Sequence, residues 1–266
     1  MTGISHAEVA EDKLGWQPRA IVRGLLIGLI LVLLFVPHML FRAVGAKSPI
    51  SQLFLKGVCW AVGLKVYTHG DRRSQDVLYV SNHVSWMDII ALGGATGCAF
   101  VSKAEVEQWP VIGWLADQIG TVYVKREDRR AVMGQAMELR EAVAKGGPVT
   151  LFPEGTTNDG ITIKPFRASL LASMVDPPGG AKVQPVVLDY GKDAADIAWT
   201  EADLAPNLKR VLARADKMEV HLYFLEPLAD ELTHDRKVMA SAARDAIVYA
   251  MAETGNMASG RVRYRL

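Results

Sequence analysis

Short β-branched runs alternate with helical patterns along most of this chain, and this alternation constrains the fold more than any other feature. The runs lie at residues 77–80, 99–102, 121–124, 149–152, 183–188 and 220–225. Between the third and fourth, residues 130–145 carry apolar side chains at helical spacing, and two glycines follow as a C-terminal stop. Residues 109–118 and 235–253 also read as helices. Such alternation predicts an α/β fold with a mixed, largely parallel sheet flanked by helices.

The first fifty residues differ because they carry a long apolar run. Residues 24–36 read GLLIGLILVLLFV, and a second apolar stretch at 53–66 follows a polar turn. The first run is shorter than the roughly 20 residues of a membrane span. We therefore expect a membrane-associated helical hairpin within residues 1–69 and an α/β catalytic domain at 70–266, with a single span as the open alternative. The acidic leader argues against a cleaved signal peptide.

Composition narrows the possible functions. The net charge is +1, so no overall field attracts nucleic acid. Two cysteines, Cys59 and Cys98, are too few for a disulfide framework and lack metal-ligand spacing. They indicate buried thiols in a reducing compartment.

The strongest local motif reads SNHVSWMD at residues 81–88, directly after an apolar strand. On a regular helix His83 and Asp88 would lie about 140° apart, so they can meet only if His83 is in a loop and Asp88 in the first helical turn. Ser85 is a good N-cap for that helix. A histidine held by a carboxylate is the arrangement of a general base. In the alternative interpretation Asp88 only completes a capping box.

Two further polar turns follow predicted strands. One reads FPEGT at residues 152–156, and ligands in open α/β sheets bind at the carboxyl ends of strands. There Gly155 permits close backbone approach, and Glu154 can accept hydrogen bonds from hydroxyls. The other turn ends in Arg126, whose planar fork suits a phosphate. A plain turn and a solvated charge cluster are the respective alternatives.

Together these segments resemble the four motifs of the phospholipid/glycerol acyltransferase family, of the 1-acylglycerol-3-phosphate acyltransferase type. Asn82-His83 with Asp88 looks like its N-H-x4-D motif. The second, third and fourth motifs are similar to GTVYVKR at residues 120–126, FPEGT at 152–156 and VQPV at 183–186. The motifs occur in the family's order, and the resemblance covers roughly residues 50–225.

The resemblance implies an O-acyltransferase that moves a fatty acyl group from acyl-ACP or acyl-CoA to a lysophospholipid, first of all 1-acyl-sn-glycerol-3-phosphate. It implies His83 as the base and Asp88 as its partner, with no metal and no cofactor beyond the thioester co-substrate. It also implies a set of substrate-binding residues. These are Lys103, Arg126, Glu154, Gly155, Thr156 and Arg167.

Thr157 departs from the family, whose third motif usually has arginine there. This leaves Arg126, Lys164 and Arg167 to hold a phosphate. The EGTT form resembles bacterial relatives that include lyso-ornithine lipid acyltransferases, whose acceptor carries no phosphate. Lyso-ornithine lipid is therefore the alternative acceptor.

Two other classes of protein compete with an acyltransferase. A serine lipid hydrolase could use Ser81 or Ser85 beside His83, although the chain has no G-x-S-x-G elbow. A non-catalytic membrane adaptor would carry an intact dyad without using it.

Because acyl thioesters are made in the cytoplasm, we expect the protein at the cytoplasmic face of a bacterial inner membrane, with membrane lipids and acyl carrier protein or CoA thioester as partners. Acyl-chain length, donor carrier and oligomeric state stay open.

Overall fold

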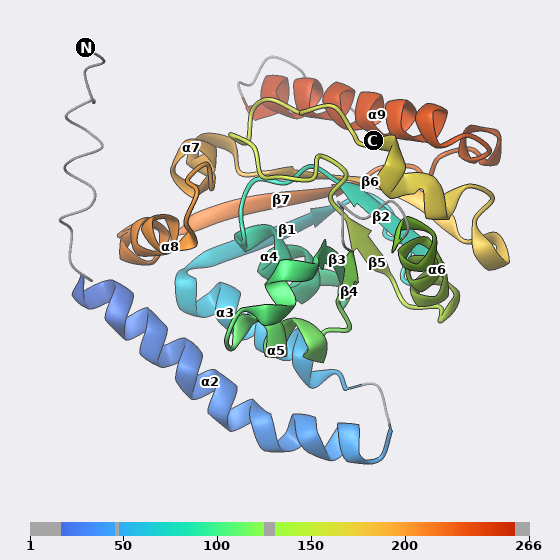
Figure 1. Cartoon of the computed structure of the whole chain (residues 1–266). Coiled ribbons are helices and arrows are strands. Elements are labelled where there is room, and N and C mark those ends of the chain that lie inside the picture. Colours follow the sequence, from blue (N-terminus) through green and yellow to red (C-terminus); the bar gives the residue numbers. More distant parts are fainter. Residues whose placement is uncertain (1–16, 46–47, 125–130, 259–266) are drawn as a thin grey trace, which may run out of the picture.

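A seven-stranded sheet forms the centre of the computed structural model, which describes residues 17–45, 48–124 and 131–258 (Figure 1). Its strands are β1 (Leu64–His69), β2 (Val77–Ser81), β3 (Ala99–Lys103), β4 (Val122–Val124), β5 (Val149–Leu151), β6 (Lys182–Asp189) and β7 (Met218–Phe224). They lie in the order β1-β7-β6-β2-β5-β3-β4. Only β6 and β7 pair antiparallel among these strands. The predicted mixed, largely parallel sheet is confirmed.

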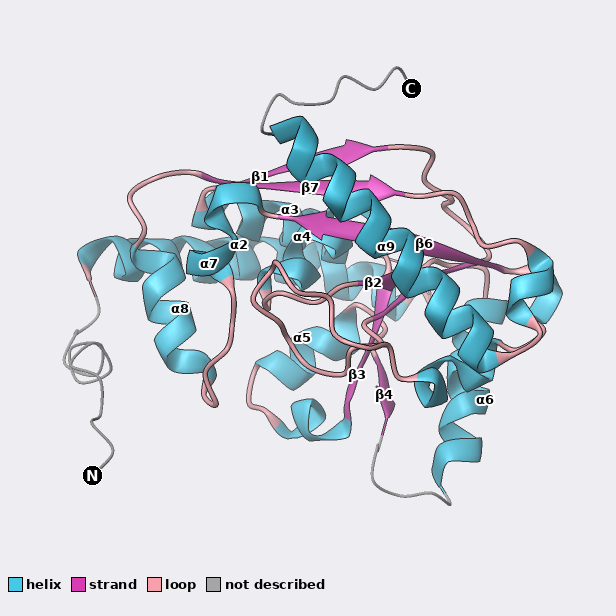
Figure 2. Ribbon diagram, turned by 90° about the horizontal axis from the view of Figure 1, so that it is seen from above, coloured by secondary structure: helices cyan, strands magenta, loops and turns pink. Residues whose placement is uncertain are grey.

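Helices cover both faces of this sheet (Figures 1 and 2). The α-helices of the described residues are α2 (Pro18–Ala43), α3 (Ile50–Val62), α4 (Met87–Thr96), α5 (Ile112–Gln118), α6 (Ala131–Ala144), α7 (Ala194–Ile197), α8 (Leu204–Ala213) and α9 (Arg236–Ala258). One apolar core joins α3, α4 and α8 to the sheet. A second core joins α6 and α9 to the opposite face. The layered α/β architecture follows from these two cores.

The predicted strands and long helices are present, with shifts at their ends. Helix α5 begins at Ile112 and not at Trp109 as predicted, because the residue before Pro110 is disfavoured in a helix. Helix α6 ends before Gly146, which adopts a φ of 84°. The short helices α7 and α8 were not predicted, because α7 has only four residues and α8 has a proline, Pro206, in its first turn.

Strand β1 corrects the prediction for residues 53–66. This stretch was expected to be one helix, which is wrong for its last three residues. Helix α3 ends at Val62, and Gly63 follows it as the C-cap with a φ of 82°, the left-handed conformation common after a helix. The chain then pairs with β7 along Leu64–His69. The sheet thus begins before the predicted division of the chain at residues 69 and 70, and that division stays a prediction.

Helix α2 is longer than its uncharged run suggested. It continues through Pro37 for 26 residues, or about 39 Å at roughly 1.5 Å per residue. Its most apolar window has a mean hydropathy of 2.6 and only 6% of it is buried. The helix is therefore long and apolar enough to cross a membrane, and it packs along α3 to form the predicted hairpin.

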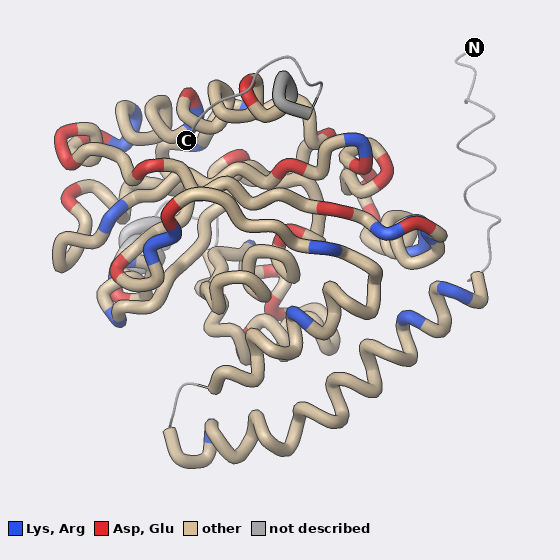
Figure 3. Tube along the Cα trace, turned by 180° about the vertical axis from the view of Figure 1, so that it is seen from behind, with Lys and Arg blue, Asp and Glu red and all other residues tan. Residues whose placement is uncertain are grey.

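Polar contacts attach α2 to the rest of the molecule near both of its ends. Near the first, the Arg23 guanidinium donates to the carbonyls of Leu212 and Arg214 at 2.9 and 3.0 Å. Near the other, His38 is 5% exposed and bonds Gln118 Oε1 at 3.1 Å. Between these contacts α2 contains no Lys, Arg, Asp or Glu residue (Figure 3). Its exposed middle is thus wholly apolar or neutral.

Candidate active site

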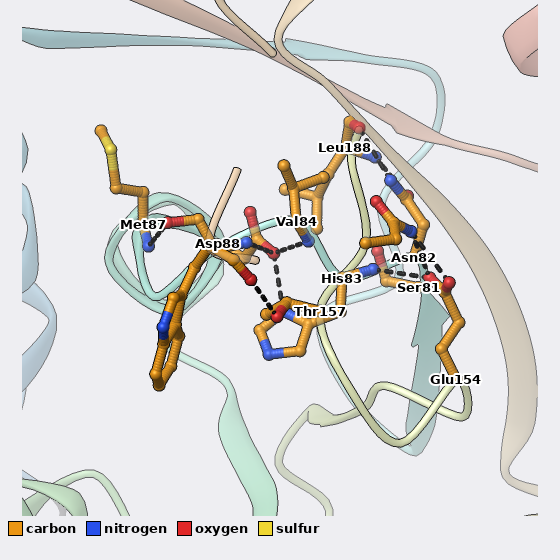
Figure 4. A network of polar contacts seen from close by, with 12 residues as sticks. Ser81, Asn82, His83, Val84, Met87, Asp88, Glu154, Thr157 and Leu188 are labelled. Carbon is orange, nitrogen blue, oxygen red and sulfur yellow. Dashed lines mark hydrogen bonds and ion pairs between the residues drawn. The ribbon is translucent and has the colours of Figure 1, made fainter. Parts of the chain in front are cut away.

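His83 lies in the turn between β2 and α4, at the carboxyl edge of the sheet (Figure 4). Its Nδ1 donates to Asp88 Oδ2 at 2.7 Å, since a carboxylate can only accept. The side chain of His83 is 18% exposed and that of Asp88 is 0% exposed. The predicted contact between a loop histidine and a first-turn aspartate is therefore present.

The start of α4 differs in detail from the prediction. The N-cap position belongs to Trp86, so Ser85 as N-cap is wrong. Asp88 Oδ2 instead reaches back and accepts the N–H groups of Val84 and Ser85 at 2.6 and 3.0 Å. The same oxygen thus caps the helix and holds His83. The contact with His83 and the capping contacts therefore coexist on one carboxylate oxygen, and the catalytic role of Asp88 stays a prediction.

The second oxygen of Asp88 has a partner that the motifs did not reveal. The Tyr190 hydroxyl donates to Asp88 Oδ1 at 2.6 Å. Burial, and then the nearby Asp88 carboxylate, raise the pKa of the Tyr190 phenol well above its ordinary value. Tyr190 directly follows β6, which is parallel to β2. A polar aromatic residue at the end of a strand beside the His83 strand was the available signal, but spacing along the chain does not show which atom its hydroxyl reaches.

Asn82 connects the His83 turn to β6 by two hydrogen bonds. Its side-chain amide donates to the Leu188 carbonyl at 2.9 Å and accepts the Leu188 N–H at 2.8 Å. Both residues are fully buried. The paired contact extends the pairing of β2 and β6 beyond Ser81 and fixes the backbone immediately before His83.

The FPEGT turn after β5 packs directly against the His83 turn, because β5 and β2 are neighbouring parallel strands. Glu154 Oε1 accepts the His83 backbone N–H at 2.9 Å. The Asn158 N–H in turn donates to the His83 carbonyl at 2.7 Å. The Phe152 ring stacks on the imidazole with centroids 4.1 Å apart. These contacts hold the His83 peptide and ring from the side opposite Asp88.

Glu154 itself is almost completely enclosed by protein groups. It is 2% exposed, and its two oxygens accept from Asn158 Nδ2 and from the Lys164 N–H as well as from His83. Burial raises the pKa of Glu154, and these hydrogen bonds oppose that rise. Its described contacts are positioning contacts, and its predicted role in acceptor binding stays a prediction.

The other predicted binding residues are spread around this edge. Lys103 ends β3 and Arg167 precedes a short 3-10 turn, and both are exposed. Thr156 is exposed beside Gly155, which is buried and has a φ of 75°. Arg126 lies outside the described residues. The roles of all five in substrate binding stay predictions.

Thr157 and Lys164 are engaged with the chain itself. The Thr157 hydroxyl donates to the Trp199 carbonyl. The Lys164 ammonium donates to the Thr157 carbonyl at 2.7 Å. Position 157 therefore supplies no cation, and one N–H of the exposed Lys164 ammonium is bonded to the chain itself.

The arrangement can act as a general base. With Nδ1 donating to Asp88, the lone pair of the neutral imidazole is on Nε2, which has no hydrogen-bond partner among the residues that the structure describes. A serine hydrolase does not fit, because Ser81 Oγ donates to the Val186 carbonyl at 2.8 Å and both Ser81 and Ser85 are fully buried. Neither hydroxyl contacts His83 in the described part of the chain.

Known proteins resemble this chain in sequence and in fold. A family model described as Acyltransferase matches residues 64–189. The lyso-ornithine lipid O-acyltransferase of Pseudomonas aeruginosa is 35% identical over 77% of this chain and 79% of its own length. That of Rhodobacter capsulatus is 31% identical over 90% and 92%. The 1-acyl-sn-glycerol-3-phosphate acyltransferase of Neisseria meningitidis serogroup B is 30% identical over 74% and 78%.

A solved structure agrees with the architecture. The crystal structure of the 1-acyl-sn-glycerophosphate acyltransferase from Thermotoga maritima matches with a TM-score of 0.60. The match covers 93% of this chain and 97% of that chain at 18% sequence identity. At that identity the likeness supports the fold.

Proposed function

The chain belongs to the acyltransferase family, and from that premise we propose that it transfers a fatty acyl group to the hydroxyl of a lysolipid with His83 as general base. One observation carries the proposal. The imidazole is bonded through Nδ1 to the buried Asp88 carboxylate at 2.7 Å, which leaves Nε2 to accept a proton.

The reaction that this geometry supports is direct transfer. Nε2 of His83 takes the proton of the acceptor hydroxyl while the oxygen attacks the thioester carbonyl. A C–O bond forms, the C–S bond breaks, and the thiolate leaves with the proton that the imidazolium returns. Asp88 keeps the imidazole in the tautomer with the proton on Nδ1 and stabilises the imidazolium. The donor in this proposal is acyl-ACP or acyl-CoA, and no other cofactor enters the reaction.

We propose lyso-ornithine lipid as the acceptor. Thr157 stands where the family usually has arginine, its hydroxyl is bonded to Trp199, and Lys164 is bonded to the Thr157 carbonyl. Position 157 therefore supplies no cation for a phosphate. The high similarity to the Pseudomonas and Rhodobacter enzymes supports the same acceptor.

Lysophosphatidate is the second candidate. Lys103 and Arg167 are exposed at the same edge of the sheet, and they could bind a phosphate although position 157 has no arginine. The similarity to the Neisseria enzyme favours this acceptor as well.

Acyl transfer from a labelled palmitoyl thioester to each acceptor, by purified protein in detergent, tests the proposal. We expect turnover of lyso-ornithine lipid. Turnover of lysophosphatidate alone would contradict the proposed acceptor and leave the acyltransferase intact. Thr157→Arg should improve kcat/KM for lysophosphatidate relative to lyso-ornithine lipid. Ile161→Arg, which adds the same charge at an exposed position of the same loop, should leave this ratio unchanged.

The proposed reaction takes place at a membrane surface, because acceptor and product are both lipids. The exposed apolar middle of α2 provides the attachment. Since acyl thioesters are made in the cytoplasm, we place the active site at the cytoplasmic face of a bacterial inner membrane. Removing residues 1–47 should abolish vesicle binding and activity on vesicles. A soluble truncated chain that keeps full activity on vesicles would contradict this attachment.

A further inference from the structure

We propose that Tyr190 is a positioning residue of this active site, which orients Asp88 and tunes how strongly Asp88 holds the proton on His83. The inference rests on the proposed role of His83 as general base. Tyr190 does not reach His83 directly in the described contacts, so it acts through Asp88.

The geometry gives each oxygen of Asp88 a separate task. Oδ2 accepts from His83 Nδ1 and from the N–H groups of Val84 and Ser85, at 2.6 to 3.0 Å. Oδ1 accepts from the Tyr190 hydroxyl at 2.6 Å. Without Tyr190 this second oxygen would be buried with no donor among the described residues. The phenol therefore completes the set of hydrogen-bond donors that prevents the Asp88 carboxylate from rotating away from His83.

Tyr190 reaches Asp88 from a rigid part of the fold. It follows β6, which pairs with β2 as far as Ser81 and is fastened again by Asn82. Its side chain is 3% exposed and belongs to the core that includes α3 and α4. The hydroxyl is thus held at a fixed distance from the helix that carries Asp88, as a positioning group requires.

The groups around the dyad keep Tyr190 a donor. Burial raises the pKa of the Cys59 thiol on α3 to about 12, so this neighbour of Tyr190 is neutral. The raised pKa of Tyr190 keeps the phenol protonated as well. Glu154, on the loop after β5, faces His83 from the other side. Among the described residues, the Asp88 carboxylate bonds the His83 imidazole and the Glu154 carboxylate bonds the His83 backbone. The Tyr190 hydroxyl donates to Asp88 and so disperses the charge of that carboxylate.

Loss of the Tyr190 hydroxyl has a directional consequence. The Asp88 carboxylate would keep more of its negative charge for the imidazole, because one strong donor is gone. A more negative partner stabilises the protonated imidazole. The free base would then appear only at higher pH, and the activity at neutral pH would fall. A tyrosine that only filled space would have no such effect.

The test compares Tyr190→Phe with the intact full-length chain in detergent. Diethyl pyrocarbonate modifies neutral imidazole, so the extent of His83 modification at each pH, read by peptide mass spectrometry, follows the free base without any turnover. The exposed His234 in the same samples is an internal reference. Tyr79→Phe is the matched variant, since Tyr79 is another fully buried tyrosine and its hydroxyl donates to the Arg73 carbonyl, away from the dyad.

We expect Tyr190→Phe to move the midpoint of His83 modification up by about half a pH unit to one unit, with His234 unchanged. The acidic limb of the kcat profile should move in the same direction. At neutral pH kcat should fall about 10-fold, less than the roughly 10² to 10⁴-fold contribution of a general base, with KM for the acceptor unchanged. Tyr79→Phe should show none of these changes.

An unmoved His83 midpoint in Tyr190→Phe would overturn the positioning role, whatever happens to the rate. The same shift in Tyr79→Phe would also overturn it, because the effect would then belong to any buried hydroxyl. If the intact chain transfers no acyl group and the His83 midpoint still moves, the proposed function fails and the role of Tyr190 toward Asp88 stands.

Discussion

Two histidine–aspartate pairs occur in the described part of this molecule with almost the same geometry and very different surroundings. His83 Nδ1 lies 2.7 Å from Asp88, and His234 Nδ1 lies 2.6 Å from Asp176. The side chains of the first pair are 18% and 0% exposed, whereas those of the second are 65% and 70% exposed. A short distance between the two groups therefore does not distinguish a dyad from a surface contact.

The difference lies in what else holds the carboxylate. Asp88 has three further donors, from two backbone N–H groups and from Tyr190. Among the described residues the Asp176 side chain bonds only His234, and both side chains are exposed to water. A buried carboxylate with a full set of donors fixes one orientation of its histidine, whereas an exposed pair exchanges with solvent. The comparison predicts which substitutions affect catalysis.

The largest effect should come from removing the two imidazoles in turn. We expect His83→Ala to lower kcat by about 10³-fold, within the range of a positioned general base. His234→Ala should leave kcat within about twofold, because exposed surface changes have small effects. Acyl transfer from the labelled thioester measures both. Near-normal activity of His83→Ala would refute the assignment of the base and remove the distinction between the pairs.

Replacing the two aspartates should have the next largest effect. Asp88→Asn keeps the shape of the side chain but loses the charge, and kcat should fall about 10² to 10³-fold because the imidazole is misoriented. It should also lower the free energy of unfolding by about 1–3 kcal/mol, since buried donors lose their acceptor. Asp176→Asn should change neither kinetics nor urea unfolding. Equal losses in the two variants would mean that burial is not what separates the pairs.

Glu154→Gln tests whether the FPEGT turn contributes to the difference between the two histidine–aspartate pairs. His234 has no equivalent of Glu154 among its described contacts. An amide cannot accept from all the donors around Glu154, so the His83 turn should loosen and kcat should fall about 10-fold. The KM of the acceptor separates two roles. An unchanged KM supports positioning of His83, and a rise in KM with little change in kcat would support acceptor binding.

The same variant has a defined pH dependence of stability. Burial raises the pKa of Glu154 above its ordinary value, so the folded chain keeps this proton to a higher pH than the unfolded chain. The stability contributed by Glu154 is therefore present at acid pH and declines as the pH rises through the raised pKa. Urea unfolding of the parent and of Glu154→Gln should show the parent's advantage shrinking from acid toward neutral pH. A growing advantage would contradict the raised pKa of Glu154 and would mean that the hydrogen bonds to its carboxylate outweigh its burial.

The sequence identified the parts of the site that depend on local spacing. His83 and Asp88 are five residues apart, so the strand end and the helix start between them were enough to predict their contact. The meeting of the His83 and Glu154 turns followed from the parallel strands that precede them. Tyr190 is 102 residues from Asp88, and no local pattern reports which side chain reaches a given oxygen from that distance.

Prediction of the fold from the sequence has the same limit. The six runs of β-branched residues became strands because each is bounded by polar turns. β1 was missed because its first residues continue an apolar helix, and only Gly63 and the partner strand β7 end that helix. Thr157 was recognised as a departure, but its contact with Trp199 depends on how α7 and α8 fold over the active-site turn. Side-chain partners across the sheet are set by packing, which spacing along the chain does not encode.

The smallest effect should be the coupling within the exposed pair itself. A double-mutant cycle of His234→Ala and Asp176→Ala should give an interaction of about 0–1 kcal/mol in unfolding experiments, as for exposed ion pairs, and high salt should reduce it toward zero. The corresponding cycle of His83→Ala and Asp88→Ala should keep its coupling in high salt, because ions do not reach the buried carboxylate. A salt-independent coupling of similar size in the exposed pair would show that the short contact alone is sufficient. The buried donors around Asp88 would then not be what makes His83 different from His234.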